Sequence, residues 1–346
     1  MRAKRRAVGD RPPGRAVAAL VSAAAALLVI CSLAGCGAAG LTGGSVLPPP
    51  SSAPPATRST AQRPPEVASL APGVADEASG IAAATGRRDA FFVVDDGTGT
   101  SQIVAIDSKG ATIARIDVDG MSADNAEALS AGSCGSTPNG AGEILPARAR
   151  CLYIGDIGGN SGRENIVIYR IVEPSLSPVP ANPVPADAWS YDYPDEPQNA
   201  EGLLVEPDGS LLVITKAPPH HSGPVGPHRI YRAPPGGGQL RLVSRFSPPD
   251  PPIALQSLLT GNVVTDAAAA PGRVLLLTYD QVVEYLAPSK TADLATFPDW
   301  PHQNLTMPRM VQAEGITPTR DGCGYALASE AGPGGDAGAI AVVPCG

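Results

Sequence analysis

The chain has 346 residues, with 25 basic and 33 acidic side chains and a formal net charge of −8 at pH 7. Without its first 35 residues, which hold six basic residues and one acidic residue, it has 19 basic against 32 acidic side chains, a net charge of −13. A chain this acidic shows no excess of basic residues that would attract nucleic acid or anionic lipid head groups. A cation or a neutral polar ligand fits it better, and we expect no nucleic-acid partner.

Residues 1–35 have the form of a signal peptide. Basic residues precede the 15-residue apolar run Ala16–Ile30, which is too short to cross a bilayer comfortably. The sequence LAGC at 33–36 follows and resembles the lipobox of bacterial lipoproteins. This resemblance implies cleavage after Gly35, a lipid on Cys36, and anchoring at the extracytoplasmic face of the cell membrane. An ordinary secretory signal with a chance cysteine is the alternative.

Residues 36–66 are rich in proline, glycine, serine and threonine, a composition that favours an extended tether without a core of its own. Residues 67–346 then form the folded domain. Its 280 residues are ordinary for a single all-β fold.

The expected domain contains four cysteines. An even number in an exported domain indicates disulfides, and four cysteines allow three pairings. Their proximity in the sequence favours Cys134–Cys151 and Cys323–Cys345. A zinc site is the alternative, although the sequence has no C-x-x-C spacing and no histidine near these cysteines.

Short aliphatic and aromatic runs, separated by turn-forming residues, indicate an all-β chain after residue 66. Five segments similar to AEGL follow one another at separations of 48, 74, 65 and 48 residues. The shorter separations match the length of a four-stranded propeller blade, ~40–50 residues. The repeats start at Ser79, Glu127, Glu201, Asp266 and Glu314.

Each repeat start predicts an inner strand, which two further strands follow. Second strands are expected over 91–96, 152–156, 211–216, 275–280 and 325–330, and third strands over 102–108, 165–171, 228–233, 282–287 and 338–343. A fourth strand is legible in the first three repeats and weak in the fourth, and the fifth repeat ends without one. We expect the segment EVASLAP, 66–72, to supply it and close the ring. Five blades are counted, and six remain an alternative.

In a propeller blade, the start of the inner strand and the end of the second strand lie at one face, because the two strands are antiparallel. We therefore expect these positions to meet at the mouth of the central channel, where small neighbouring residues allow the strands to approach closely. The candidate metal ligands are Glu127, Glu201, Asp266, Glu314 and Asp156. The other candidate residues of the mouth are Asp95, Asp96, Asn160, Arg163, Lys216, Tyr279 and Glu330.

Several carboxylates at one mouth would repel each other unless a cation, Lys216 or bound protons neutralised them. A ring of oxygen ligands favours Ca²⁺ over metals that prefer softer ligands. The alternative for each single acid is that it caps a loop or accepts hydrogen bonds from backbone N–H groups.

The segment YIGDIGGNSGREN, 153–165, leaves two interpretations open. Asp156 and Asn160 flank a glycine-rich turn and can cap its backbone amides. Alternatively, Asp156 binds a metal while Arg163 holds the loop or an anionic group of a substrate.

The segments ASGI, VVDDG, NAEAL, YIGDIGGN, NAEGLL, VITK, LLLTY and QAEGI together resemble a group of exported or lipid-anchored propeller proteins from actinobacteria, over about residues 79–331. More distantly, the strand starts are similar to those of gluconolactonase-like and esterase-like phytase propellers. In the former a glutamate of this kind binds a divalent metal, which the resemblance assigns to Glu127, Glu201 or Glu314. The chain departs from that pattern with five repeats instead of six and no clear set of asparagine ligands.

We expect a monomeric, lipid-anchored binding module of the cell envelope, because a propeller leaves only short, protected strand edges. Its ligand is an envelope partner or a small molecule. The alternative is a metal-dependent hydrolase of a lactone or a phosphoester, in which Lys216 or a free carboxylate handles protons. The sequence shows no G-x-S-x-G motif and no other nucleophile–base pair, which favours binding and leaves the question of an enzyme open.

Overall fold

The computed structural model describes residues 62–159, 162–217, 226–332 and 336–346. These residues belong to one compact unit, Arg58–Gly346. The signal peptide, Cys36, most of the tether and Asn160 lie outside the described residues. Among the described residues, no helix has the length and apolar character needed to span a membrane.

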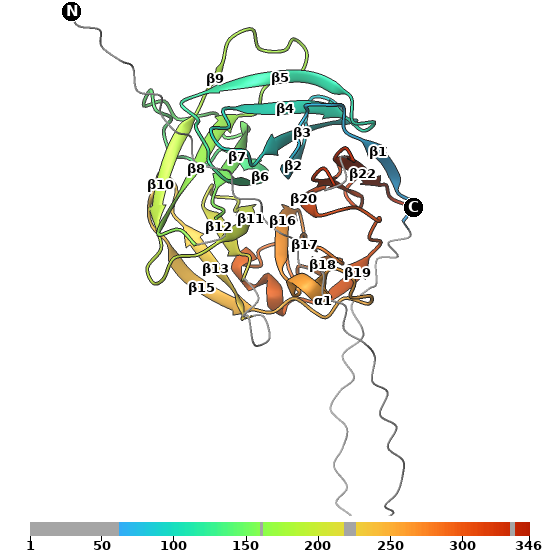
Figure 1. Ribbon diagram of the computed structural model, residues 1–346. Coiled ribbons are helices and arrows are strands. Elements are labelled where there is room, and N and C mark those ends of the chain that lie inside the picture. Colours follow the sequence, from blue (N-terminus) through green and yellow to red (C-terminus); the bar gives the residue numbers. More distant parts are fainter. Residues whose placement is uncertain (1–61, 160–161, 218–225, 333–335) are drawn as a thin grey trace, which may run out of the picture. The chain divides into compact units, whose positions relative to one another are not determined.

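Five small sheets are arranged around a common centre, so the chain is an all-β, five-bladed propeller (Figure 1). From the centre outward, blade 1 contains β2 (Ala78–Ala83), β3 (Ala90–Asp95), β4 (Gln102–Asp107) and β5 (Thr112–Asp119), and blade 2 contains β6 (Ala126–Ser133), β7 (Arg150–Asp156), β8 (Asn165–Val172) and β10 (Asp187–Asp192). Blade 3 contains β11 (Ala200–Val205), β12 (Leu211–Thr215), β13 (His228–Ala233) and β15 (Arg241–Phe246), and blade 4 contains β16 (Val264–Ala270), β17 (Arg273–Thr278), β18 (Val282–Leu286) and β19 (His302–Leu305). Blade 5 contains β20 (Ala313–Pro318), β21 (Tyr325–Ser329), β22 (Ala339–Val343) and β1 (Glu66–Ser69).

The ring is closed by the N-terminal strand, as the sequence predicts. β1 pairs antiparallel with β22, from Glu66 opposite Val342 to Ser69 opposite Ala339. This pairing covers the edge that β22 would otherwise leave open. The strand begins one residue before the expected start of the domain, at Glu66.

Short elements at the rim connect neighbouring blades. The two-residue strands β9 (Val184–Pro185) and β14 (Gly238–Gln239) pair in parallel with β5 and β10 of the preceding blades. Two short helices, α1 (Ser257–Thr260) and the 3₁₀ helix η1 (Leu294–Asp299), lie in the loops before β16 and β19. The weak fourth strand of the fourth repeat is the four-residue β19.

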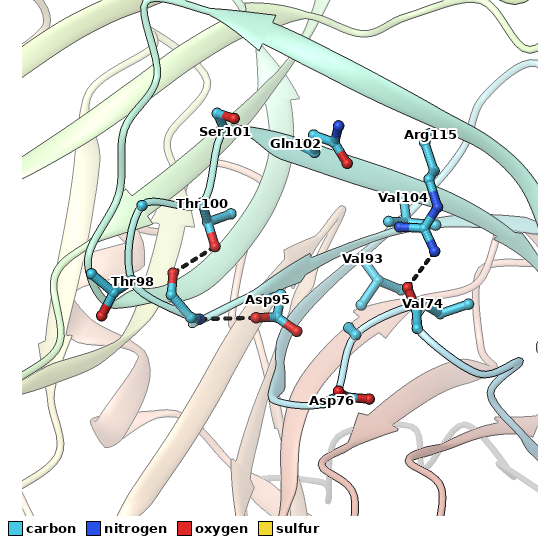
Figure 2. Close-up of a pocket in the computed structure, with 14 residues that line it drawn as sticks. Val74, Asp76, Val93, Asp95, Thr98, Thr100, Ser101, Gln102, Val104 and Arg115 are labelled. Carbon is cyan, nitrogen blue, oxygen red and sulfur yellow. Dashed lines mark hydrogen bonds between the residues drawn. The ribbon is translucent and has the colours of Figure 1, made fainter.

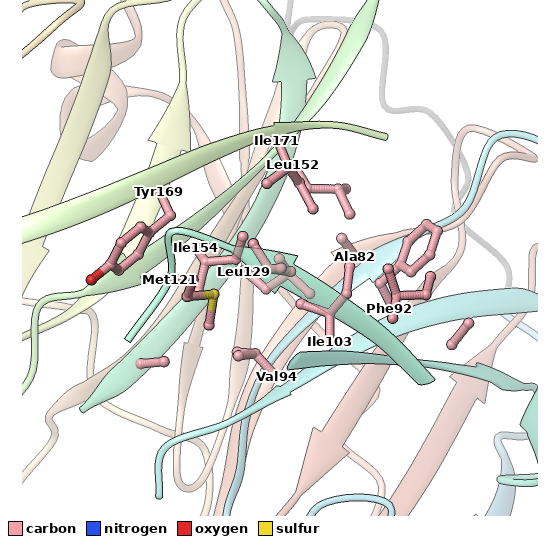
Figure 3. Close-up of a cluster of buried hydrophobic side chains, with 14 of the residues drawn as sticks. Ala82, Phe92, Val94, Ile103, Met121, Leu129, Leu152, Ile154, Tyr169 and Ile171 are labelled. Atoms are coloured by element: carbon pink, nitrogen blue, oxygen red, sulfur yellow. The ribbon is translucent and has the colours of Figure 1, made fainter. Parts of the chain in front are cut away.

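The apolar core lies between the blades, because the inner strands of each sheet are buried on both faces. Figure 3 shows the cluster between blades 1 and 2, where Phe92 and Ile103 face Leu129, Leu152 and Ile154. Four similar clusters are found in the described residues. The structure also contains both expected disulfides, Cys134–Cys151 and Cys323–Cys345.

Candidate functional site

The five inner strands share one irregularity at their starts. In each strand, the pairing with the second strand skips a single residue, as in a β-bulge. The skipped residues are Ser79, Glu127, Glu201, Thr265 and Glu314. A bulge re-aims the side chain that it carries, so these five residues are the equivalent positions of the ring. The equivalent residue of blade 4 is therefore Thr265, and Asp266 occupies the position of the glycine or alanine that follows.

Three of these residues, Glu127, Glu201 and Glu314, form a buried cluster. Each offers a carboxylate oxygen, and these atoms all lie within 4.8 Å of one another. The glutamates come from the inner strands of blades 2, 3 and 5, which Figure 1 shows around the centre of the ring. They are exposed by only 7%, 1% and 3%. Residues up to 187 positions apart in the sequence thus meet at one end of the central channel.

The other two blades place hydroxyl groups at the same position. The Ser79 hydroxyl donates to the carbonyl oxygen of Ala126, and the Thr265 hydroxyl donates to that of Ala313 at 2.9 Å. In both cases the acceptor belongs to the next blade, just before its own skipped glutamate. These bonds connect neighbouring blades where the inner strands converge.

Glycines next to the bulges allow this convergence. A Cβ atom on Gly80 would lie 2.4 Å from the backbone nitrogen of Leu129, in the next blade. A Cβ atom on Gly158 would lie 2.2 Å from both Cγ and Oε1 of Glu127. Gly158 belongs to the distinctive glycine-rich segment, and its missing side chain is the space that the Glu127 carboxyl group fills.

Lys216 and Tyr279 complete the cluster. The Lys216 Nζ atom lies 2.9 Å from Oε1 of Glu201 and 5.7 Å from the centre of the Tyr279 ring. The Tyr279 hydroxyl donates to Oε1 of Glu314 at 2.7 Å. The second carboxylate oxygen of Glu201, Oε2, is buried and has no hydrogen-bond partner.

Burial and mutual repulsion change the protonation of these groups. Burial raises the pKa of Glu127 to about 10, and the charge of Glu201 adds to the effect. Burial raises the pKa of Glu201 to about 7, although Lys216 opposes the change. Burial alone would lower the pKa of Lys216, but the charges of Glu201 and Glu314 raise it above its usual range. Without a cation, the cluster therefore retains protons at neutral pH.

Two further acids extend the mouth. Burial raises the pKa of Asp96 to about 7, with Glu77 and Glu314 contributing through their charges. Burial also raises the pKa of Glu330 to about 8, and its hydrogen bond to Glu314 favours the protonated form. Both follow second strands, where the sequence places them.

The structure does not bring Asp266 and Asp156 into the cluster. The two carboxylate oxygens of Asp266 accept hydrogen bonds from the backbone nitrogens of Ala267 and Ile316, each at 2.7 Å. Asp156 pairs with Arg163 at 2.5 Å and accepts a bond from the backbone nitrogen of Asn125 at 3.1 Å. Both have the capping role that was the alternative, because nearby donors satisfy their oxygens.

Asp95 is not part of the glutamate cluster, and one of its carboxylate oxygens lies within 4.8 Å of one each from Glu77 and Asp96. Its carboxylate accepts a hydrogen bond from the Gly97 backbone nitrogen at 2.9 Å, and it lines a polar pocket of about 380 Å³ (Figure 2). Asp76, Thr100 and Arg115 line the same pocket. The sequence reasoning did not find this pocket, because its residues come from two loops and from three strands of blade 1, which share no motif.

No family model and no curated protein matches the chain. Among solved structures, the PQQ-bound aldose sugar dehydrogenase from Streptomyces coelicolor is similar with 12% identity, over 81% of this chain and 99% of that chain, at a TM-score of 0.36. A luciferin-regenerating enzyme is similar with 10% identity, over 81% of this chain and 95% of that chain, at a TM-score of 0.37. The periplasmic gluconolactonase from Pseudomonas aeruginosa is similar with 14% identity, over 69% of this chain and 64% of that chain, at a TM-score of 0.35. Similarity this distant transfers no activity, ligand or site residue to this chain.

Proposed function

We propose that the protein is a cation-binding module of the cell envelope, anchored through a lipid on Cys36, and that its channel mouth binds Ca²⁺. One observation carries the cation site: Glu127, Glu201 and Glu314 converge from three blades within 4.8 Å. A buried carboxylate oxygen without a partner, such as Oε2 of Glu201, is costly unless something compensates it. A bound cation would supply that compensation. The anchor and the envelope location follow from the sequence around Cys36.

The chemistry of the donors supports Ca²⁺. The cluster offers only oxygen ligands, which hard cations prefer, and among the described residues no histidine or cysteine is part of it. Ca²⁺ takes six to eight oxygens in a flexible arrangement, so three glutamates leave coordination positions for water or for a ligand. Lys216 holds Oε1 of Glu201 and leaves Oε2 for the cation.

Thermal unfolding of the full chain at increasing Ca²⁺ concentration tests this proposal. Ca²⁺ should raise the Tm, and the increment should grow with concentration, because a ligand that binds only the folded state stabilises it by mass action. Glu127→Gln, Glu201→Gln or Glu314→Gln should each reduce that increment.

Glu206→Gln is the matched control. Glu206 is also nearly buried, but it pairs with Arg232 at 2.8 Å and is not part of the cluster. Its replacement should lower the Tm itself and leave the Ca²⁺ increment unchanged. A Tm that does not respond to Ca²⁺ would contradict the proposal.

A metal-dependent hydrolase of a lactone or a phosphoester is the second candidate, and the position of Lys216 within the cluster favours it. Since the pKa of Lys216 is raised, its ammonium group would stabilise developing negative charge and would not serve as a general base. Hydrolysis of a simple lactone or aryl phosphate that requires both Ca²⁺ and Lys216 would support this function. Equal turnover by the Lys216→Met variant would refute it.

A further inference from the structure

Four large aliphatic side chains are exposed on one short loop between β15 and β16. Ile253, Leu255, Leu258 and Leu259 are 68%, 66%, 77% and 88% exposed. Only nine large hydrophobic side chains are exposed in the described part of the chain, so this exposure is concentrated and not scattered. Contiguous exposed apolar side chains indicate an interaction site, whereas single exposed apolar side chains are ordinary. We call residues 253–259 the apolar loop.

Hydrogen bonds hold the apolar loop in its position. The Asp280 carboxylate accepts bonds from the backbone nitrogens of Leu255, Gln256 and Ser257, at 2.9, 3.0 and 2.7 Å. The Ser257 hydroxyl donates to the same carboxylate at 2.6 Å. These bonds fix the backbone while the aliphatic side chains remain in solvent, so the fold presents them on an ordered support.

The apolar loop lies next to the channel mouth. Tyr279 joins the two: its carbonyl oxygen accepts a bond from the side chain of Gln256 at 3.2 Å, and its hydroxyl donates to Glu314 at 2.7 Å. Tyr279 therefore contacts both the apolar loop and the carboxylate cluster, which are neighbours on one face.

We propose that the mouth and the apolar loop together dock a peptide segment in which a lysine or arginine is flanked by aliphatic residues. The basic side chain enters among Glu127, Glu201 and Glu314, and the aliphatic side chains cover Leu258 and Leu259. We base the choice of a basic residue on charge: among the described residues, the mouth has five carboxyl groups and one ammonium group, that of Lys216. A second cationic group would displace the protons that these carboxyl groups retain. The inference deepens the proposed function, since both use the same carboxylates.

Two other occupants fit the surface less well. Residues 251–263 contain no basic residue, whereas segments that lie on anionic lipid carry lysine or arginine. The direction of β1 is a second argument against a lipid surface at this loop. Ser69 of β1 lies level with Ala339 and Ser329 at the mouth, and Glu66 lies at the other end, so the chain enters the propeller at the face opposite the mouth. A second copy of the chain would bring a second acidic mouth, which repels the first.

Fluorescence anisotropy with a labelled pentapeptide tests the inference on the full chain. The probe has a central lysine between two pairs of leucines. One control peptide has glutamate in place of the lysine, and another has serines in place of the leucines. We expect the probe to bind, and each control to bind about tenfold more weakly or worse, the effect of losing one modest contact.

Variants of the protein separate this inference from the proposed function. The double variant Leu258→Ser, Leu259→Ser changes two exposed side chains, so it should fold normally and keep its Ca²⁺-induced rise in Tm. It should bind the probe about tenfold more weakly. Ca²⁺ should compete with the probe in the unchanged protein. If Ca²⁺ leaves the Tm unmoved while the probe binds in a loop-dependent way, the Ca²⁺ proposal fails and the docking inference stands.

Three results would overturn the docking inference. The first is a probe that does not bind, or a glutamate peptide that binds equally well. The second is uptake of the protein by phosphatidylcholine vesicles that the double serine variant abolishes, without binding of the probe. The third is a dimer in sedimentation velocity that the same variant dissociates, again without probe binding.

Discussion

Gly158→Ala is a sensitive test of the carboxylate cluster, because it fills the space behind one proposed ligand without removing any carboxyl group. The backbone of Gly158 is outside the left-handed region that favours glycine, so alanine introduces no backbone strain. The new methyl group would instead meet Glu127, at 2.2 Å from its Cγ and Oε1 atoms and 2.6 Å from its Cδ atom.

The geometry gives the size of the effect. Ordinary van der Waals contact begins at 3.4 Å, so the Glu127 side chain must move by about 1.2 Å. Ca²⁺ holds its oxygen ligands at about 2.3–2.6 Å, and a ligand displaced this far no longer coordinates well. Misplaced ligands weaken metal sites by about tenfold to a hundredfold, and we expect a loss of this order in Ca²⁺ affinity. Stability without Ca²⁺ should fall by about 1–3 kcal/mol, the usual cost of added volume at a packed position.

Calorimetric titration with Ca²⁺, together with thermal unfolding, measures both quantities. Gly155→Ala is the matched control from the same segment, since the nearest atoms to its Cβ would be those of the Ile157 side chain, at 3.2 Å or more. The control should keep full Ca²⁺ affinity. If Gly158→Ala binds Ca²⁺ as the unchanged protein does, or if both variants lose affinity equally, Glu127 is not a ligand and the reasoning is wrong.

Burial lowers the pKa of His228 to about 4 from 6.5, so only the unfolded state gains a proton as the pH falls between these values. His228 should therefore contribute a loss of up to about 3 kcal/mol over that window, opposite in sign to the contribution of the buried acids whose pKa values are raised. Chemical denaturation at several pH values isolates this contribution as the difference between the unchanged protein and His228→Gln, and equal pH dependence of the two would refute this cause. The disulfides join cysteines 17 and 22 residues apart, and replacing either pair by serine should lower the free energy of unfolding by roughly 3 kcal/mol. Free thiols at Cys134 and Cys151 in non-reducing peptide maps of exported protein would contradict the pairing. Cys36→Ser should release the protein from the membrane fraction or leave it unprocessed, and fractionation with membranes after unchanged cleavage would rule out the lipid anchor.

The sequence by itself determined the architecture and most members of the mouth. Alternating strands, the repeated AEGL pattern and the need to cover the last open edge are local features, so they predicted the blades, the closing strand at Glu66–Ser69 and both disulfides. Glu127, Glu201 and Glu314 were found for the same reason, because each stands in the same short motif at a strand start.

Only the tertiary structure decided which acids meet. We aligned Asp266 with the repeated glutamates because it is acidic. The pairing of β16 with β17 instead skips Thr265, and the Asp266 carboxylate accepts hydrogen bonds from backbone amides. Asp156 is likewise satisfied by Arg163. The side chain that a bulge re-aims depends on the register between two strands, which no single strand's sequence specifies.

The remaining features depend on contacts between distant segments. The space that Glu127 fills exists because Gly158 lies behind it, and the apolar loop is held in solvent by Asp280 from another strand end. Their local sequences, a glycine-rich turn and a proline-rich loop, are compatible with many conformations. Closing the ring brings strands far apart in the chain to one channel, and this long-range geometry sets the distances between the carboxyl groups and hence their shared protons.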